Sequence, residues 1–160
     1  MTELTSQQIA EYFSRSYKTV DGLWFMKVEE KYGFDAALAI DNEVWKVMPK
    51  IQARQIKQFL GLKEGSDALL EGLETKLELE GFKFAVEKTE KGFRISITDC
   101  PWYNLMIKSG REHFAKKVGK NICCTEYQVW VSELAENMKF KLLSQKCAKS
   151  ERCVLDFVKH

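Results

Sequence analysis

The sequence predicts an α+β fold, in which a helical N-terminal part is followed by an antiparallel sheet of two hairpins covered by helices. Apolar residues recur at helical spacing through the first 80 residues. The period then changes to two in residues 82–99, and again in residues 140–158, with a polar turn inside each stretch. Because neighbouring hairpins can pair along their edges, we expect one four-stranded antiparallel sheet.

Capping signals and chain-breaking residues divide the N-terminal part into several expected helices. The stretch Thr5–Gln8 has the form of a capping box, with a hydroxyl at the cap and an amide three residues later. Gly33, Pro49 and Gly61 then separate the apolar stripes. The expected helices are residues 9–16, 23–32, 35–48 and 50–60, followed by a helix that Ser66 caps and Gly81 ends.

Two hairpins flank a second helical stretch in the C-terminal part. Alternation in Phe82–Asp99, around a polar tip at Thr89–Gly92, predicts the first hairpin. Helical spacing returns in residues 102–137, where Asn121 is a plausible cap, and Phe140–Val158 predicts the second hairpin. We therefore expect a helical region at residues 1–65 and an α+β ligand- and metal-binding region at residues 66–160, together forming one compact domain.

The composition excludes several classes of protein. The chain has 160 residues, 45% of them hydrophobic and 30% charged, which suits one globular domain. The net charge is +2 and lysines and glutamates are interspersed without a basic block, so nucleic acid is not an expected partner. No apolar run is long enough to cross a membrane, and the first residues do not resemble a secretory signal. We expect a cytoplasmic protein whose thiols stay reduced.

All five cysteines lie in the last 61 residues. Cys100, Cys123, Cys147 and Cys153 are each expected at the end of an element, so they can meet if the hairpins are neighbours in one sheet. Four thiolates would suit zinc or an iron–sulfur cluster, and a helix start at Asn121 would stabilise a thiolate at Cys123. The spacing lacks a CxxC pair. A disulfide between Cys147 and Cys153, or a purely apolar role for the thiols, stays open.

Aromatic residues accompany the cysteines along the chain. Trp102, Tyr127 and Trp130 could form the wall of a small-molecule pocket, although a packed core uses the same residues. Arg111 could bind a carboxylate through two parallel hydrogen bonds, or could simply be a surface arginine. His113, the single internal histidine, has charged neighbours that favour an exposed helix face over a role as ligand or base.

The motifs around the cysteines carry a resemblance to known families. A Cys-Pro-Trp at residues 100–102, an Ile-Cys before a Tyr and a Trp in "ICCTEYQVW", and a final Cys pair around a tight turn are similar to the L-2-amino-thiazoline-4-carboxylic acid hydrolase family, most of whose members are uncharacterised. The similarity extends from about Tyr17 to Phe157. The C-terminal part more distantly resembles 4-vinyl reductase domains, relatives of haem-NO-binding ligand domains.

The second resemblance implies a small ligand and a metal held by cysteines near the C-terminus. It maps Cys100, Cys123, Cys147 and Cys153 onto recurring cysteines and leaves Cys124 as an extra one. This chain departs from the pattern in its final turn, where the families carry Gly-Asp and residues 148–152 contain no glycine. The turn that would bring the last two thiols together therefore lacks its usual residue for a positive φ.

The sequence is compatible with three functions, of which we favour ligand binding. The protein is expected to be a small-molecule-binding or sensory domain with a cysteine-bound metal. An alternative is a hydrolase acting on a small cyclic amino-acid derivative, with Cys100 and Arg111 as first suspects; a second is a metal-free interaction module. The expected partners are a small-molecule ligand and, since we expect no attached output domain, a second copy in a homodimer formed through the helical half.

Overall fold

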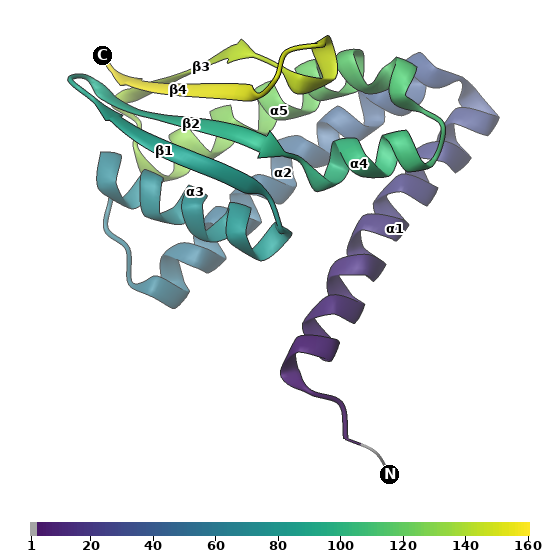
Figure 1. Cartoon of the computed structure of the whole chain (residues 1–160), viewed down its shortest axis with the longest axis horizontal. Helices are drawn as coiled ribbons and strands as arrows, with labels where there is room; N and C mark the ends of the chain where they lie inside the picture. The colour runs from purple at the N-terminus through teal and green to yellow at the C-terminus, as the bar shows by residue number, and fades with distance from the viewer. Residues whose placement is uncertain (1–2) are drawn as a thin grey trace. The chain divides into compact units, whose positions relative to one another are not determined.

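The computed structural model describes residues 3–160 and has the predicted α+β architecture (Figure 1). Its elements are α1 (Ser6–Tyr32), α2 (Phe34–Leu60), α3 (Ser66–Glu80), β1 (Lys83–Thr89), β2 (Gly92–Asp99), α4 (Pro101–Lys108), α5 (Glu112–Leu134), β3 (Met138–Ser144), the short 3₁₀ helix η1 (Lys146–Ala148) and β4 (Cys153–Lys159). The chain forms two compact units, Met1–Asp41 and Asn42–His160. The boundary expected at residue 65 falls inside the second unit, in the link between α2 and α3.

Helix α1 begins at the predicted capping box. The Gln8 N–H donates to the Thr5 hydroxyl at 3.2 Å, and the Thr5 N–H donates to the Gln8 side chain at 2.9 Å. The expected division into two helices is wrong, because α1 continues through Gly22 to Tyr32. A single internal glycine costs only about 1 kcal/mol of helix propensity, which the surrounding turns offset. Gly33, with φ 87°, then separates α1 from α2.

Helix α2 is also longer than predicted, since it continues through Pro49. Proline removes one backbone donor and crowds the preceding turn, which is why the sequence favoured a break there. Pro49 is fully buried, and Trp45, Ala53 and Ile56 are buried at helical spacing on the same side. The packing of this stripe in the second unit outweighs the local cost of the proline.

The second unit contains the sheet, whose strand order is β1-β2-β4-β3 with every neighbouring pair antiparallel. The two predicted hairpins are therefore confirmed, and they join through β2 and β4. Phe93, Ile95 and Ile97 alternate as buried residues along β2, and Phe93 stacks on Phe157 of β4 with ring centroids 4.8 Å apart. Helices α3 and α5 pack against the sheet and complete the core (Figure 1).

No helix within residues 3–160 has the length and apolar character needed to cross a membrane.

Candidate functional site

Four separate elements of the second unit bring four cysteines to one end of the sheet. Cys100 follows β2 directly and caps α4, whereas Cys153 opens β4, pairing with Ile97 just before the end of β2. Cys147 lies in η1, in the connection between β3 and β4, and Cys123 lies on α5. Cys153 raises the pKa values of Cys100 and Cys147, and all three of these thiols raise the pKa of Cys123. We call these four residues the thiol cluster.

Close contacts hold two of these thiols in place. A Cβ atom on Gly119 of α5 would lie 3.0 Å from the Cys147 Sγ, so the missing side chain leaves the space that this sulfur occupies. The Lys146 N–H donates to the Cys153 Sγ at 3.2 Å. A backbone donor in this irregular connection therefore reaches a sulfur, and such donors stabilise thiolates.

Burial raises the pKa of every thiol in the cluster. It raises the pKa of Cys100 to about 11, although the nearby amides of Tyr103 and Trp102 act in the opposite direction. Burial raises the pKa of Cys123 well above its ordinary value, and it also raises the pKa values of Cys147 and Cys153. In the absence of a metal, the four thiols are therefore protonated at neutral pH.

The predicted helix start at Asn121 is wrong, and with it the expected electrostatic help for Cys123. Helix α5 begins at Glu112 and runs without a break through Gly119, so Cys123 lies in its middle. The Asn121 side chain donates to the Lys117 carbonyl one turn earlier instead of capping a helix. Since the helix dipole acts only within the first and last turns, it does not lower the pKa of Cys123.

The turn between Cys147 and Cys153 contains a positive-φ residue although it has no glycine. Lys149 takes the left-handed conformation, with φ 71° and ψ 18°, and its N–H donates to the Lys146 carbonyl at 3.0 Å. Across the same turn, the Ser144 hydroxyl donates to the Arg152 carbonyl at 2.9 Å. A lysine therefore takes a conformation that glycine adopts more readily, at some cost in strain.

Within residues 3–160, no three His, Cys, Asp or Glu side chains stand close enough together to hold a metal ion. The four thiols of the thiol cluster therefore belong to one end of the sheet, but no three of them are placed closely enough to share an ion.

A buried ionic network, which sequence reasoning missed, lies beside the thiol cluster. Lys76 is 2% exposed, and its Nζ lies 2.6 Å from the Glu126 Oε1 and 3.3 Å from the Glu80 Oε2. Glu80 also accepts hydrogen bonds from the Trp102 indole at 3.2 Å and from the Gln52 amide at 3.3 Å. A signal was present, because Lys76 adjoins Leu77 on the buried apolar stripe of α3.

The charges of this network act on the thiols. Burial alone would lower the pKa of Lys76, but Glu126 and Glu80 outweigh it and raise that pKa well above its ordinary value. Burial raises the pKa of Glu126, which Lys76 partly opposes. Glu126 in turn contributes to the raised pKa of Cys123, whereas Lys76 acts to lower the pKa of Cys100. The thiol cluster and the ionic network therefore interact electrostatically.

The three aromatic residues predicted to bind a ligand lie near the ionic network, in different environments. Trp102 is partly exposed and packs edge-on against Trp45, with ring centroids 5.7 Å apart. Tyr127 and Trp130 are buried members of the hydrophobic core, and the Lys76 ammonium lies 5.6 Å from the centre of the Tyr127 ring. The Trp130 indole N–H has no hydrogen-bond partner among the described residues.

The remaining candidate residues lie apart from the thiol cluster. Arg111 follows the end of α4 opposite to Cys100, and its guanidinium lies 5.1 Å from the centre of the Phe114 ring. His113 is exposed on α5, as its charged neighbours predict. Burial raises the pKa of Cys124 and Lys120 opposes the rise, and none of the cluster thiols contributes to it.

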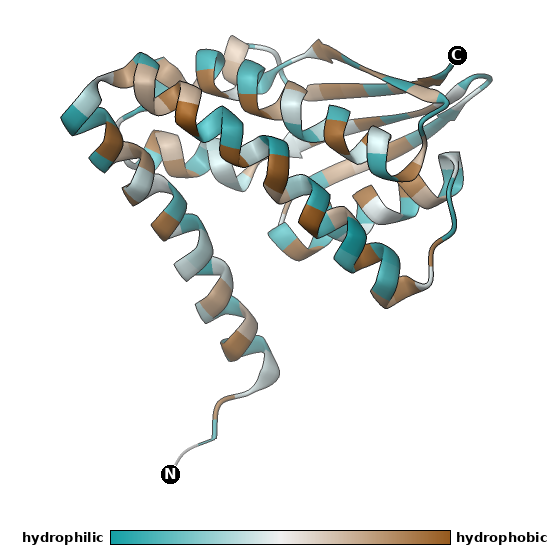
Figure 2. Ribbon diagram, turned by 180° about the vertical axis from the view of Figure 1, so that it is seen from behind, coloured by the Kyte–Doolittle hydropathy of each residue, from teal (hydrophilic) through white to brown (hydrophobic). Residues whose placement is uncertain are grey.

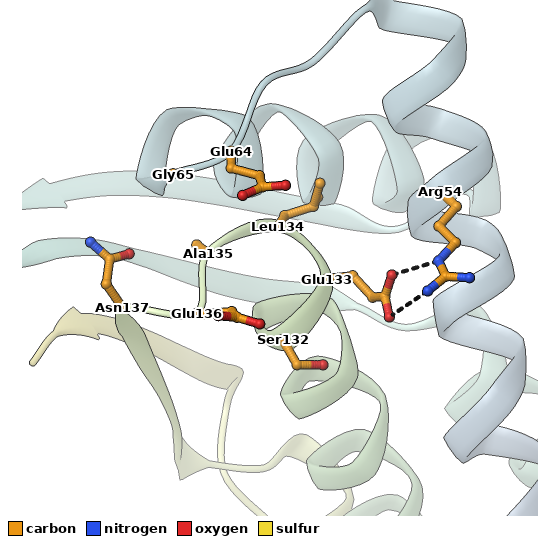
Figure 3. A pocket seen from close by; sticks show the side chains of 9 residues that line it. All are labelled: Arg54, Glu64, Gly65, Ser132, Glu133, Leu134, Ala135, Glu136 and Asn137. Atoms are coloured by element: carbon orange, nitrogen blue, oxygen red, sulfur yellow. Dashed lines mark hydrogen bonds and ion pairs between the residues drawn. The ribbon is translucent and has the colours of Figure 1, made fainter.

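A pocket of about 520 Å³ lies at the C-terminal end of α5 (Figure 3). It is lined by Arg54, Glu64, Gly65, Ser132, Glu133, Leu134, Ala135, Glu136 and Asn137. The Arg54 guanidinium faces Glu133, with Nε 2.7 Å from Oε2. The four residues predicted to bind a ligand, Trp102, Arg111, Tyr127 and Trp130, do not line this pocket.

Comparison with known proteins places the chain in a family without an assigned activity. The chain belongs to a family of unknown function, DUF6125, whose model matches residues 3–157. No curated protein and no solved structure matches the chain. The match covers most of both compact units.

The raised thiol pKa values predict that the metal-free protein loses stability in alkaline solution. An unfolded cysteine ionises near pH 9, whereas folded Cys100 stays protonated to about pH 11, so the free energy of unfolding should fall as the pH rises from 9 to 11. Urea unfolding of chelator-treated, reduced protein at several pH values would measure this. The fall should be shallower in Cys100→Ser. If the free energy of unfolding fell equally steeply with pH in both proteins, Cys100 would not have the raised pKa.

Proposed function

We propose that the thiol cluster binds a thiophilic metal, zinc or an iron–sulfur cluster, within a small-molecule-binding or sensory domain. The observation that supports this best is the convergence of Cys100, Cys123, Cys147 and Cys153 from four elements, while Cys124 stays outside. Thiolate sulfur is a preferred donor for both kinds of metal centre. The resemblance to 4-vinyl reductase domains supports the sensory part of the proposal.

The residues of this chain would perform three tasks at such a centre. The thiols must lose their protons, so binding should strengthen as the pH rises. Gly119 leaves room for the Cys147 sulfur, and the Lys146 N–H supports the Cys153 sulfur. A bound ion would connect β4 and its preceding turn to α5 and α4, and the positive charge of Lys76 would offset part of the thiolate charge.

A hydrolase acting on a small cyclic amino-acid derivative is the alternative, and the geometry supports it less. A cysteine nucleophile needs an accessible thiolate, whereas burial raises the pKa of Cys100 to about 11. Arg111, the suggested anion clamp, lies beyond the opposite end of α4. A metal-free interaction module, the other alternative, would leave the cysteines as core residues.

Metal analysis of anaerobically purified protein tests the proposal. We expect about one zinc ion, or the iron of one cluster, per chain, because structural thiolate sites bind zinc with about 10–16 kcal/mol. Cys153→Ser should weaken the affinity at least about 100-fold in competition with a chromophoric chelator. Cys124→Ser should leave it unchanged. Equal metal content in wild type and Cys153→Ser, or no measurable affinity in the wild type, would contradict the site.

A glycine substitution tests the same site without removing a donor. Gly119→Ala places a methyl group 3.0 Å from the Cys147 Sγ, so metal affinity should fall at least about 10-fold. Helix propensity favours the alanine by about 1 kcal/mol, and the fold should therefore survive the change. Gly22→Ala is the matched control, since nothing lies within 4 Å of its added Cβ. Equal metal affinities in the two variants would refute the role given to Gly119.

A further inference from the structure

One side of α1 is apolar and exposed along the length of the helix. Six large apolar residues recur there at spacings of three and four, and Figure 2 shows hydrophobic residues recurring along this helix. They are Ile9, Tyr12, Phe13, Val20, Leu23 and Trp24, with Ser16 and Lys27 completing the row. At 100° per residue all eight positions fall within about one third of the helix circumference. We call this row the α1 stripe.

The exposure of the α1 stripe is unusual for a free surface. Tyr12, Phe13 and Trp24 are 66%, 65% and 68% exposed, and Leu23 is 51% exposed. Aromatic residues are enriched at protein interfaces, and large contiguous apolar patches mark sites of association. The α1 stripe therefore has the composition of a covered surface.

Its area is sufficient for a stable contact between two copies. Aromatic side chains bury roughly 150–250 Å² each, so the three aromatic residues expose roughly 400 Å². The three aliphatic residues add roughly 200 Å² by the same scaling. Two copies would together bury about 1,200 Å², which lies at the lower end of the range for specific interfaces.

The spacing of positions along the α1 stripe is symmetric about its centre, as a two-fold axis between antiparallel copies requires. The eight positions, 9, 12, 13, 16, 20, 23, 24 and 27, are separated by 3, 1, 3, 4, 3, 1 and 3 residues, a series that is the same in both directions. Two antiparallel copies centred at the level of residue 18 would place Tyr12 opposite Trp24 and Phe13 opposite Leu23. The small Ser16 would face Val20 near the centre, where the helices approach most closely.

We propose that the α1 stripe is a homodimer interface, in which α1 packs antiparallel against α1 of a second copy. Such a contact is isologous, so the same residues serve both chains and the assembly closes at two. Antiparallel helices also place their dipoles in opposite directions. The proposal goes beyond metal binding and does not depend on it, because no cysteine lies on α1.

Sedimentation equilibrium of the full chain between about 1 and 100 μM tests this interface. We expect a wild-type dimer, and at least about a 100-fold higher dissociation constant for Phe13→Glu and for Trp24→Glu. Leu79→Glu is the control, because Leu79 is 71% exposed on α3 and outside the α1 stripe. Circular dichroism would confirm that each variant is folded. A monomeric wild type, or equal loss of the dimer in the control, would overturn the proposal.

A charge exchange tests the antiparallel register. Phe13→Glu and Leu23→Lys should each weaken the dimer, whereas the double variant should bind at least about 10-fold more tightly than either single variant at low salt. In the proposed arrangement each Glu faces a Lys of the second copy, twice per dimer. In a parallel pair, Glu would face Glu. Absence of any rescue would overturn the antiparallel arrangement, and capture of a different protein by a monomeric chain would overturn the homodimer.

Discussion

Replacing Lys76 with alanine is expected to lower the free energy of unfolding by about 3–5 kcal/mol. The ammonium is 2% exposed and lies between the carboxylates of Glu126 and Glu80, both also buried. Without it, two buried carboxyl groups lose their cation, and Glu126 must take up a proton or remain charged in an apolar setting. Urea unfolding of the reduced protein at neutral pH would measure the loss.

Three further variants, Lys76→Met, Lys76→Met with Glu126→Gln, and Arg54→Ala, separate the ionic network from simple loss of packing. The double variant Lys76→Met with Glu126→Gln should recover much of the stability lost in Lys76→Met, because a buried ion pair can often be replaced by neutral groups. Arg54→Ala, which breaks an ion pair with Glu133 at an exposed side chain, should cost no more than about 1 kcal/mol. If the loss of stability in the double variant equalled the sum of the losses from its two single substitutions, Lys76 and Glu126 would not be coupled.

Replacing Trp130 with alanine is expected to cost about 3–5 kcal/mol of stability. Trp130 is fully buried on α5, and a Cβ on Gly72 of α3 would lie only 3.2 Å from its ring, so the indole fills the space between these helices. Its N–H makes no hydrogen bond among the described residues. Trp130→Phe should therefore cost less than half as much, since it removes volume but no hydrogen bond.

The same variants distinguish a core residue from the wall of a ligand pocket. Leu79→Ala, on an exposed position of α3, should change stability by no more than about 0.5 kcal/mol. A pocket-lining tryptophan would behave differently, because its removal would abolish ligand binding with little loss of stability. A cost below about 1 kcal/mol for Trp130→Ala would therefore favour the pocket predicted from the sequence over the core.

The local order of the chain was largely predictable from its sequence. The change from a period of 3.6 to a period of two located both hairpins, because alternate residues of a half-buried strand face opposite sides of the sheet. The capping box at Thr5 located the start of α1, since its hydrogen bonds involve only residues three apart. Such signals depend on neighbouring residues, so the sequence contains them in full.

Chain-breaking residues were less reliable guides. Pro49 and Gly119 both lie inside continuous helices, where burial of Pro49 with Trp45 and contact of the Cys147 sulfur with Gly119 give each residue a packing role. The misplaced start of α5 at Asn121 had a direct consequence for the site. A helix start at Asn121 would have lowered the pKa of Cys123 through the helix dipole, which has no such effect in the middle of a helix.

The sequence by itself determined the α+β class and the two hairpins. Only the tertiary structure showed how Ile97 and Cys153 pair, and that Lys76, Glu80 and Glu126 form a buried network beside the thiols. The physical reason is the range of the interactions. Periodicity and capping act between residues a few positions apart, whereas strand register and charge pairing in the interior depend on residues about 50 positions apart.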